Sequence, residues 1–123
     1  MIKFYFNNEQ PIYLQIANQL KLAIVTAELL PGEKLPPVRD FATIAQVNPN
    51  TMQRALSELE ETGLIYTERT SGRYVTTNSD HIRRCREQLA RSKIANFLDD
   101  IDRLQLSRHD VIKLIEQIGG IHD

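Results

Sequence analysis

Residues 47–63 have the sequence VNPNTMQRALSELEETG and predict one helix whose two ends are both encoded. Asn48 is a good N-cap, because its side-chain oxygen can accept from the unpaired amides of a first helical turn. Pro49 follows at the first helical position, where its missing N–H is tolerated. Gly63 suits the left-handed residue just past a helix end. We therefore expect a helix over residues 48–62.

This helix has two different faces. The apolar residues recur at helical spacing and form one stripe: Met52, Ala55, Leu56 and Leu59. The first two turns also carry polar side chains: Asn50, Thr51, Gln53 and Arg54. Such groups hydrogen-bond base edges and phosphates in a major groove. A solvated surface helix has the same pattern, so the neighbouring segments must decide between the two interpretations.

Two further helices precede it. Pro11 suits a first helical position, and Leu30-Pro31-Gly32 stops the segment. Its expected core stripe is Tyr13, Ile16, Ala17, Leu20, Ala23, Ile24 and Ala27. A shorter helix begins at Pro37 and turns four residues inward: Val38, Phe41, Ala42 and Ala45. Gln46 and Val47 connect it tightly to residues 48–62, which predicts a helix-turn-helix.

After Gly63 the apolar period changes from helical to two. Residues 64–69 and 73–77 are rich in β-branched and aromatic side chains, and the short loop 70–72 contains a glycine. This pattern predicts a β-hairpin. Three helices followed by a hairpin form a winged helix, so we expect residues 1–78 to be a winged helix-turn-helix domain. Arg69 and Arg73 flank the tip of its wing.

Residues 79–123 are helical and differently built. One helix of about 23 residues is expected first, and Ser107 with Asp110 then resembles a capping box that opens a second helix. Both helices are amphipathic, and such a pair cannot bury its apolar faces as an isolated hairpin. We expect this tail to form a dimer interface through Ile94, Phe97, Leu98, Ile101, Leu104, Val111, Leu114, Ile115 and Ile118.

Composition excludes several classes of protein. The 123 residues are 41% hydrophobic and 25% charged, with a net charge of −1 and one cysteine, Cys85. No segment approaches the roughly 18 apolar residues of a membrane span. No signal peptide is visible, so a cytoplasmic protein without membrane association is expected. Cys85, His81, His109 and His122 lack metal-site spacing, and no nucleophile–base pair or phosphate loop is present. We therefore expect no metal, no cofactor and no enzyme activity.

Several motifs keep fixed spacings across residues 11–76: P-I-Y-x-Q-I, L-x-P-G-x-K-L-P-P-x-R, V-N-x-N-T, A-L-x-x-L-x-x-x-G-L-I and G-R-Y-V. Together they resemble the GntR family of bacterial transcription regulators. The short two-helix tail looks like that of the YtrA-type subfamily. Larger relatives carry effector-binding or aminotransferase-like domains, for which this chain has no room.

The resemblance implies roles for individual residues. Arg39 stands where the family places a DNA-contacting arginine, and Gly72 stands at the wing-tip glycine. The recognition positions are Asn48, Asn50, Thr51 and Gln53. The sequence also departs from the family: the tip R-G-x-G-T-F-V is replaced by residues 69–75, RTSGRYV. Pro49 replaces an arginine that reads a base in some relatives, and Pro37 replaces a frequent serine.

The sequence thus predicts a mainly α protein of the α+β class, a winged helix-turn-helix followed by a two-helix dimerisation extension. We expect a homodimeric repressor that binds a palindromic double-stranded DNA operator through residues 48–62 and the wing at 64–77. Phosphate contacts are expected from Arg39, Arg54, Arg69 and Arg73. Two alternatives stay open: an adaptor that binds a partner protein through its winged helix, and a sensor whose tail binds a small-molecule effector.

Overall fold

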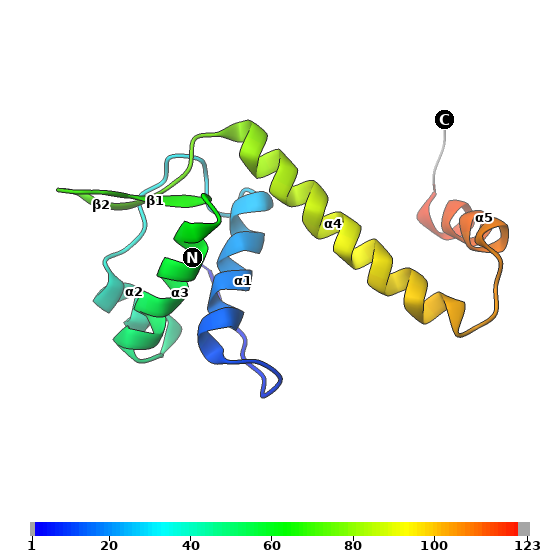
Figure 1. The fold of residues 1–123 in the computed structure, drawn as a ribbon, viewed down its shortest axis with the longest axis horizontal. Helices are drawn as coiled ribbons and strands as arrows, with labels where there is room; N and C mark the ends of the chain where they lie inside the picture. Colours follow the sequence, from blue (N-terminus) through cyan, green and yellow to red (C-terminus); the bar gives the residue numbers. More distant parts are fainter. Residues whose placement is uncertain (1, 121–123) are drawn as a thin grey trace. The chain divides into compact units, whose positions relative to one another are not determined.

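A computed structural model describes residues 2–120 and confirms the mainly α winged-helix fold (Figure 1). The described elements are α1 (Ile12–Val25), α2 (Val38–Ala45), α3 (Pro49–Glu61), β1 (Ile65–Glu68), β2 (Gly72–Val75), α4 (Ser79–Asp102) and α5 (Arg108–Gly119). The chain forms two compact units, one ending at Arg86 and the other beginning at Glu87, both within α4. Among the described helices, none is long and apolar enough to cross a membrane.

Helix α3 begins and ends as its sequence predicts. The side-chain oxygen of Asn48 accepts from the Asn50 amide at 2.7 Å, and Pro49 is the first helical residue. Gly63 follows the helix with φ of +80°, which a residue with a side chain adopts only with strain. A Cβ atom at Gly63 would also lie 3.1 Å from Nε2 of His81. Both conformation and space therefore favour glycine there.

Helix α1 ends earlier than predicted. Its last residue is Val25, and the Thr26 hydroxyl donates to the Leu22 carbonyl at 2.8 Å. Ala27 has φ of +64° and is exposed, so its predicted place in the core stripe is wrong. The Leu29 amide donates back to the Ala23 carbonyl at 3.0 Å. The side chain of Leu29, two residues further on, is buried.

The core of the first unit lies between α1, α2, α3 and the hairpin. Its largest fully buried side chains are Ile16, Leu20, Ile24, Phe41, Met52, Leu56, Leu59, Leu64, Ile65 and Val75. Each such side chain contributes on the order of 1.5–3 kcal/mol by its removal from water. These residues come from α1, α2, α3 and the hairpin, so the helix-turn-helix and the wing share one core.

The hairpin is antiparallel, with Tyr66 opposite Tyr74 and Thr67 opposite Arg73. Its strands are shorter than the predicted 64–69 and 73–77, and Gly72 belongs to β2 rather than to the loop. Residues 32–35 run along the other edge of β2. The Gly32 amide donates to the Val75 carbonyl and the Leu35 amide to the Arg73 carbonyl, each at 2.9 Å. The wing is thus anchored to the segment that leads into α2.

The N-terminal residues form an arm that is held by two glutamines of α1. The Gln19 side chain exchanges hydrogen bonds with the backbone of Tyr5, at 3.0 Å and 2.6 Å. The Gln15 side chain does the same with Asn7, at 2.9 Å in both directions. Residues 2–10 therefore run as an arm beside α1 and contain no strand.

The beginning of α4 belongs to the first unit. Ile82 is buried, and Nε of Arg86 donates to the Val25 carbonyl at 2.7 Å. This bond places a positive charge on the C-terminal end of α1, where the helix dipole favours it. Arg86 therefore joins α4 to the end of α1.

In the second unit, a short connection over residues 103–107 joins α4 to α5. The Ser107 hydroxyl accepts from the Asp110 amide at 3.1 Å, which confirms the predicted cap, and Gly120 is left-handed with φ of +62°. Arg108 bridges to Asp102, with Nη1 2.6 Å from Oδ1. This hydrogen bond lowers the pKa of the Asp102 carboxyl group below its usual range. The last residues of the predicted tail, His122 among them, lie outside the described part of the chain.

Candidate nucleic-acid interface

The polar start of α3 offers hydrogen-bonding groups to solvent. The side chains of Asn50 and Gln53 are exposed, and Thr51 is half-buried. Gln53 makes one weak bond within the helix, from its amide nitrogen to the Ser57 hydroxyl at 3.3 Å. Asn48 differs from these residues, because its side-chain oxygen already serves as the helix cap. Its amide nitrogen is the group that remains for an outside partner.

Arg54 lies against a residue of another helix. Its Cζ atom is 3.8 Å from the ring centroid of Tyr13, in the first turn of α1, and its Nη2 atom donates to the Tyr13 hydroxyl at 3.2 Å. Sequence reasoning placed Tyr13 in the core. The structure leaves it half-buried, next to the polar start of α3. Its helical spacing gave no sign of this second contact.

Arg39 lies in the first turn of α2 and is exposed. Helix α2 ends at Ala45, and Gln46 turns the chain with φ of +59°. Asn48 is already the cap of α3, so the turn between the two helices is tight. The short turn confirms the predicted helix-turn-helix connection.

The tip of the wing carries Arg69 in an exposed loop and Gly72 with φ of +120°. A Cβ atom at Gly72 would lie 3.4 Å from Cε of Lys34, so the aliphatic chain of this lysine passes beside the tip. Lys34 pairs with Tyr74 as an isolated bridge and is exposed. It adds a positive charge that sequence reasoning did not assign to the interface, although it stands in the K-L-P-P motif.

Arg73 is engaged within the protein. Its Nε atom lies 3.4 Å from Oε1 of Glu60 in α3, and its side chain is only 19% exposed. The Thr67 hydroxyl donates to the same Glu60 oxygen at 2.7 Å. Glu60 therefore ties both strands of the wing to α3.

The apolar residues of the tail mostly face solvent in the single chain. The exposed ones are Ile94, Phe97, Leu104, Ile112, Leu114, Ile115 and Ile118, while Leu98 and Ile101 are half-buried. Val111 is buried, at 3% exposure, and is therefore already covered within the single chain. Ile112 and Leu106 were not among the predicted interface residues.

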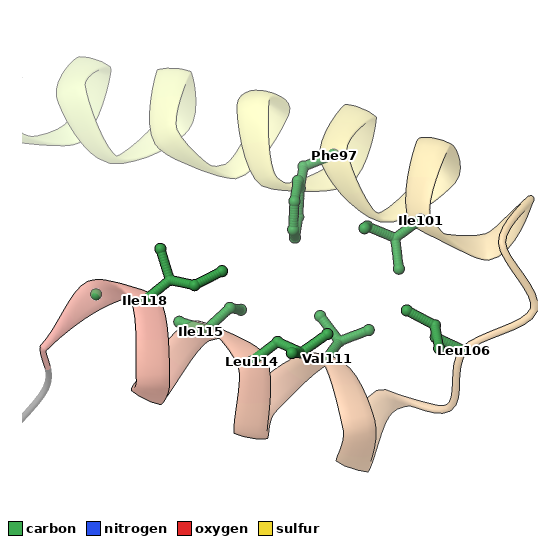
Figure 2. Close-up of a pocket in the computed structure, with 8 residues that line it drawn as sticks. Phe97, Ile101, Leu106, Val111, Leu114, Ile115 and Ile118 are labelled. Atoms are coloured by element: carbon green, nitrogen blue, oxygen red, sulfur yellow. The ribbon is translucent and has the colours of Figure 1, made fainter.

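Several of these side chains enclose an apolar groove of about 350 Å³ between α4 and α5. Figure 2 shows Phe97 and Ile101 on α4 pointing toward Val111, Leu114, Ile115 and Ile118 on α5. Leu106, in the connecting segment, closes one end. The groove thus brings together six of the predicted interface residues, whereas Ile94, Leu98 and Leu104 do not line it.

Residues 2–120 contain no cluster of three or more His, Cys, Asp or Glu side chains that could hold a metal ion. Nε2 of His81 donates to the Thr62 carbonyl at 2.6 Å, because a carbonyl oxygen only accepts. Cys85 is half-buried, with Sγ 3.9 Å from the same His81 nitrogen. These contacts give both side chains a place in the packing of the first unit.

The helix-turn-helix and the wing match a known protein family. Residues 12–75, slightly more than half of the chain, match the family model for "Bacterial regulatory proteins, gntR family". The matched segment runs from the start of α1 to the end of β2. It therefore contains the whole helix-turn-helix and the wing.

Similar proteins extend the match into the tail. The chain is 37% identical to the HTH-type transcriptional regulator YhcF of Bacillus subtilis, over 90% of this chain and 92% of YhcF. It is 35% identical to the HTH-type transcriptional repressor YtrA of the same organism, over 89% and 79% of the two chains. The solved structure of a GntR family transcriptional regulator from Listeria monocytogenes matches with a TM-score of 0.83 and 37% identity, over 91% and 98%.

Proposed function

Because the chain belongs to the GntR family of bacterial regulatory proteins, with a YtrA-like organisation, we propose that it is a homodimeric repressor that reads a palindromic operator. As a member of this family it is a DNA-binding transcription regulator and not an enzyme. The sign of regulation, the dimer and the residues that read DNA are the parts that we propose.

The observation that carries the proposal is the exposed polar start of α3. Asn50 and Gln53 are exposed there, on the second helix of a helix-turn-helix. An amide side chain can pair with both N6 and N7 of adenine in the major groove. A helix in this position enters the groove with its N-terminal residues toward the bases. The three glutamates of α3 all lie in its second half, away from this end.

The net charge of −1 does not favour DNA binding, so the charge argument rests on the local distribution of basic residues. Arg39, Arg54 and Arg69 are exposed on α2, α3 and the wing tip, and Lys34 passes beside the tip. Arg73 is partly neutralised by Glu60. We assign the first three arginines and Lys34 to phosphates, and Gly72 to a close approach of the wing to the backbone or minor groove.

The tail supplies the dimer in this proposal. Exposed apolar side chains on α4 and α5 lie together rather than singly, and such contiguous apolar patches mark interaction sites. A second copy that covers this surface and the groove of about 350 Å³ would bury them. Two linked reading heads then gain effective concentration at the second half-site of an inverted repeat.

The name of one relative supports the repressor role, since YtrA of Bacillus subtilis is a transcriptional repressor. We place the activity in the cytoplasm because its target is chromosomal DNA. The adaptor hypothesis has no comparable support, as both curated relatives named above are transcriptional regulators. The groove between α4 and α5 is consistent with the sensor alternative. Its lining is apolar, so an effector bound there would be a small apolar molecule.

A mobility-shift titration tests the proposal. The probe is the DNA upstream of the gene, and a scrambled duplex of equal composition is the control. A regulator binds the upstream DNA more tightly than the control and loses affinity steeply as salt rises. Equal binding to both duplexes, or none, would contradict sequence-specific regulation and favour the adaptor.

A further inference from the structure

The position of Arg54 decides where α3 carries positive charge. It is the single basic residue of this helix, which also has three glutamates in its second half. An arginine side chain has several rotatable bonds, and its immobilisation on binding costs affinity. A neighbour that holds the guanidinium in place before DNA arrives therefore affects binding without touching DNA.

Tyr13 is such a neighbour. The guanidinium carbon of Arg54 lies over the face of the tyrosine ring, 3.8 Å from its centroid. The Nη2 atom also donates to the hydroxyl at 3.2 Å. Tyr13 therefore holds the guanidinium at two points, the ring face and the hydroxyl. Of the five donors one serves the hydroxyl, so the others remain for a phosphate.

The surroundings place this pair beside the predicted reading residues. A hollow of about 410 Å³ is lined by Ile12, Tyr13, Asn50, Thr51 and Arg54. Tyr13 comes from the first turn of α1, and Asn50 and Thr51 from the first turn of α3. Helix α1 therefore contributes a side chain to the rim of the interface, although sequence reasoning assigned it only to the core.

We propose that Tyr13 is a positioning residue of the DNA interface, which holds the Arg54 guanidinium with its free donors directed at a DNA phosphate. This role rests on the proposed function and adds to it. It involves no base contact, so Tyr13 changes the affinity for all sequences alike and leaves the preferred sequence unchanged.

The test is a double-mutant cycle, read by fluorescence anisotropy on a duplex recovered by binding selection and on a random duplex. Tyr13→Leu removes both the ring contact and the hydroxyl, and weakens binding about two- to tenfold on both duplexes. Tyr13→Phe keeps the ring contact, so its loss of DNA affinity is smaller. In an Arg54→Ala background, Tyr13→Leu causes no further loss, because its partner is already absent.

Salt dependence separates positioning from direct contact. Arg54→Ala lowers the salt slope by about one unit, since one phosphate contact is lost. Tyr13→Leu leaves the slope unchanged, because the contact still forms at a higher entropic cost. Tyr5→Leu is the matched control, as Tyr5 is 74% exposed on the arm, and it binds like the unmodified protein.

Equal losses from Tyr13→Leu in both backgrounds, with a lowered melting temperature, would assign Tyr13 a structural role and overturn the proposal. An Arg54→Ala variant that binds like the unmodified protein would overturn it as well, while leaving the regulator function intact. Failure of the unmodified protein to select any DNA would instead contradict the proposed function itself.

Discussion

The Glu60 carboxylate lies 3.4 Å from Nε of Arg73, so an acidic residue of α3 restrains an arginine of the wing. The same carboxylate oxygen accepts from the Thr67 hydroxyl at 2.7 Å. Thr67 and Arg73 are opposite one another in the hairpin. Glu60 thereby orients the wing relative to α3, and it also places a negative charge next to an arginine that was expected to meet DNA.

We predict that Glu60→Gln strengthens binding to random DNA. The amide oxygen keeps an acceptor for Thr67, while the loss of negative charge releases Arg73 for a phosphate. The log–log salt slope should steepen by about 0.9 for one added phosphate contact. Glu61→Gln is the control, because Glu61 is exposed on the same helix and its substitution removes the same charge. Unchanged or weaker binding by Glu60→Gln alone would show that Arg73 has only a structural role.

Asn50→Ala and Gln53→Ala should change the preferred sequence more than the affinity for random DNA. Each amide presents a donor and an acceptor, and a good bidentate contact discriminates by about 1–3 kcal/mol. Binding selections on randomised operators measure this change. Ser57→Ala serves as a control, since it removes the hydrogen-bond partner of Gln53 without removing a reading residue. If both variants select the same sequence as the unmodified protein, the reading residues lie elsewhere.

The ends of α3 and the cap of α5 could be predicted, because Asn48, Gly63 and Ser107 act on the backbone within a few residues of themselves. The end of α1 could not. Pro31 and Gly32 are stronger helix breakers than Thr26, yet the chain turns at Ala27 because Leu29 fills the core. Here tertiary packing overrides local propensity.

In the candidate site, too, local features could be predicted and tertiary contacts could not. Exposed polar residues of α3 follow from the helical period, whereas the partners of Arg54, Arg73 and Arg86 are distant in sequence. Tyr13 and Arg54 are 41 residues apart, and Arg86 and Val25 are 61 apart. No local pattern identifies such pairs, so the contacts of these arginines within the protein could not be predicted from the sequence.

The pKa of Asp102 offers a test of the turn between α4 and α5. The hydrogen bond from Arg108 lowers this pKa, so the charged form contributes stability above the unfolded pKa of about 3.9. That contribution is lost as pH falls through the lower folded pKa. An NMR titration of Arg108→Ala should return the Asp102 pKa toward about 3.9. The control Arg103→Ala should leave the pKa low; an unchanged pKa in Arg108→Ala would mean that this bridge does not form.

Charge placed on the apolar surface of the tail should separate the dimer. Phe97 is 43% exposed and Ile118 is 85% exposed in the single chain. Phe97→Asp and Ile118→Asp should each raise the dimer dissociation constant about tenfold or more, because a buried unpaired charge is costly. Gln117→Asp, on an exposed polar position of α5, is the control. Sedimentation velocity measures the constants, and a monomeric unmodified protein at micromolar concentration would exclude this interface.

Binding selection by the full chain from a library of random duplexes tests the central claim most directly. A homodimer with one reading head per subunit should enrich an inverted repeat, with half-sites about one helical turn or a multiple of it apart. Enrichment of a single half-site without symmetry would contradict the dimer, and recovery of no common sequence would contradict sequence-specific regulation.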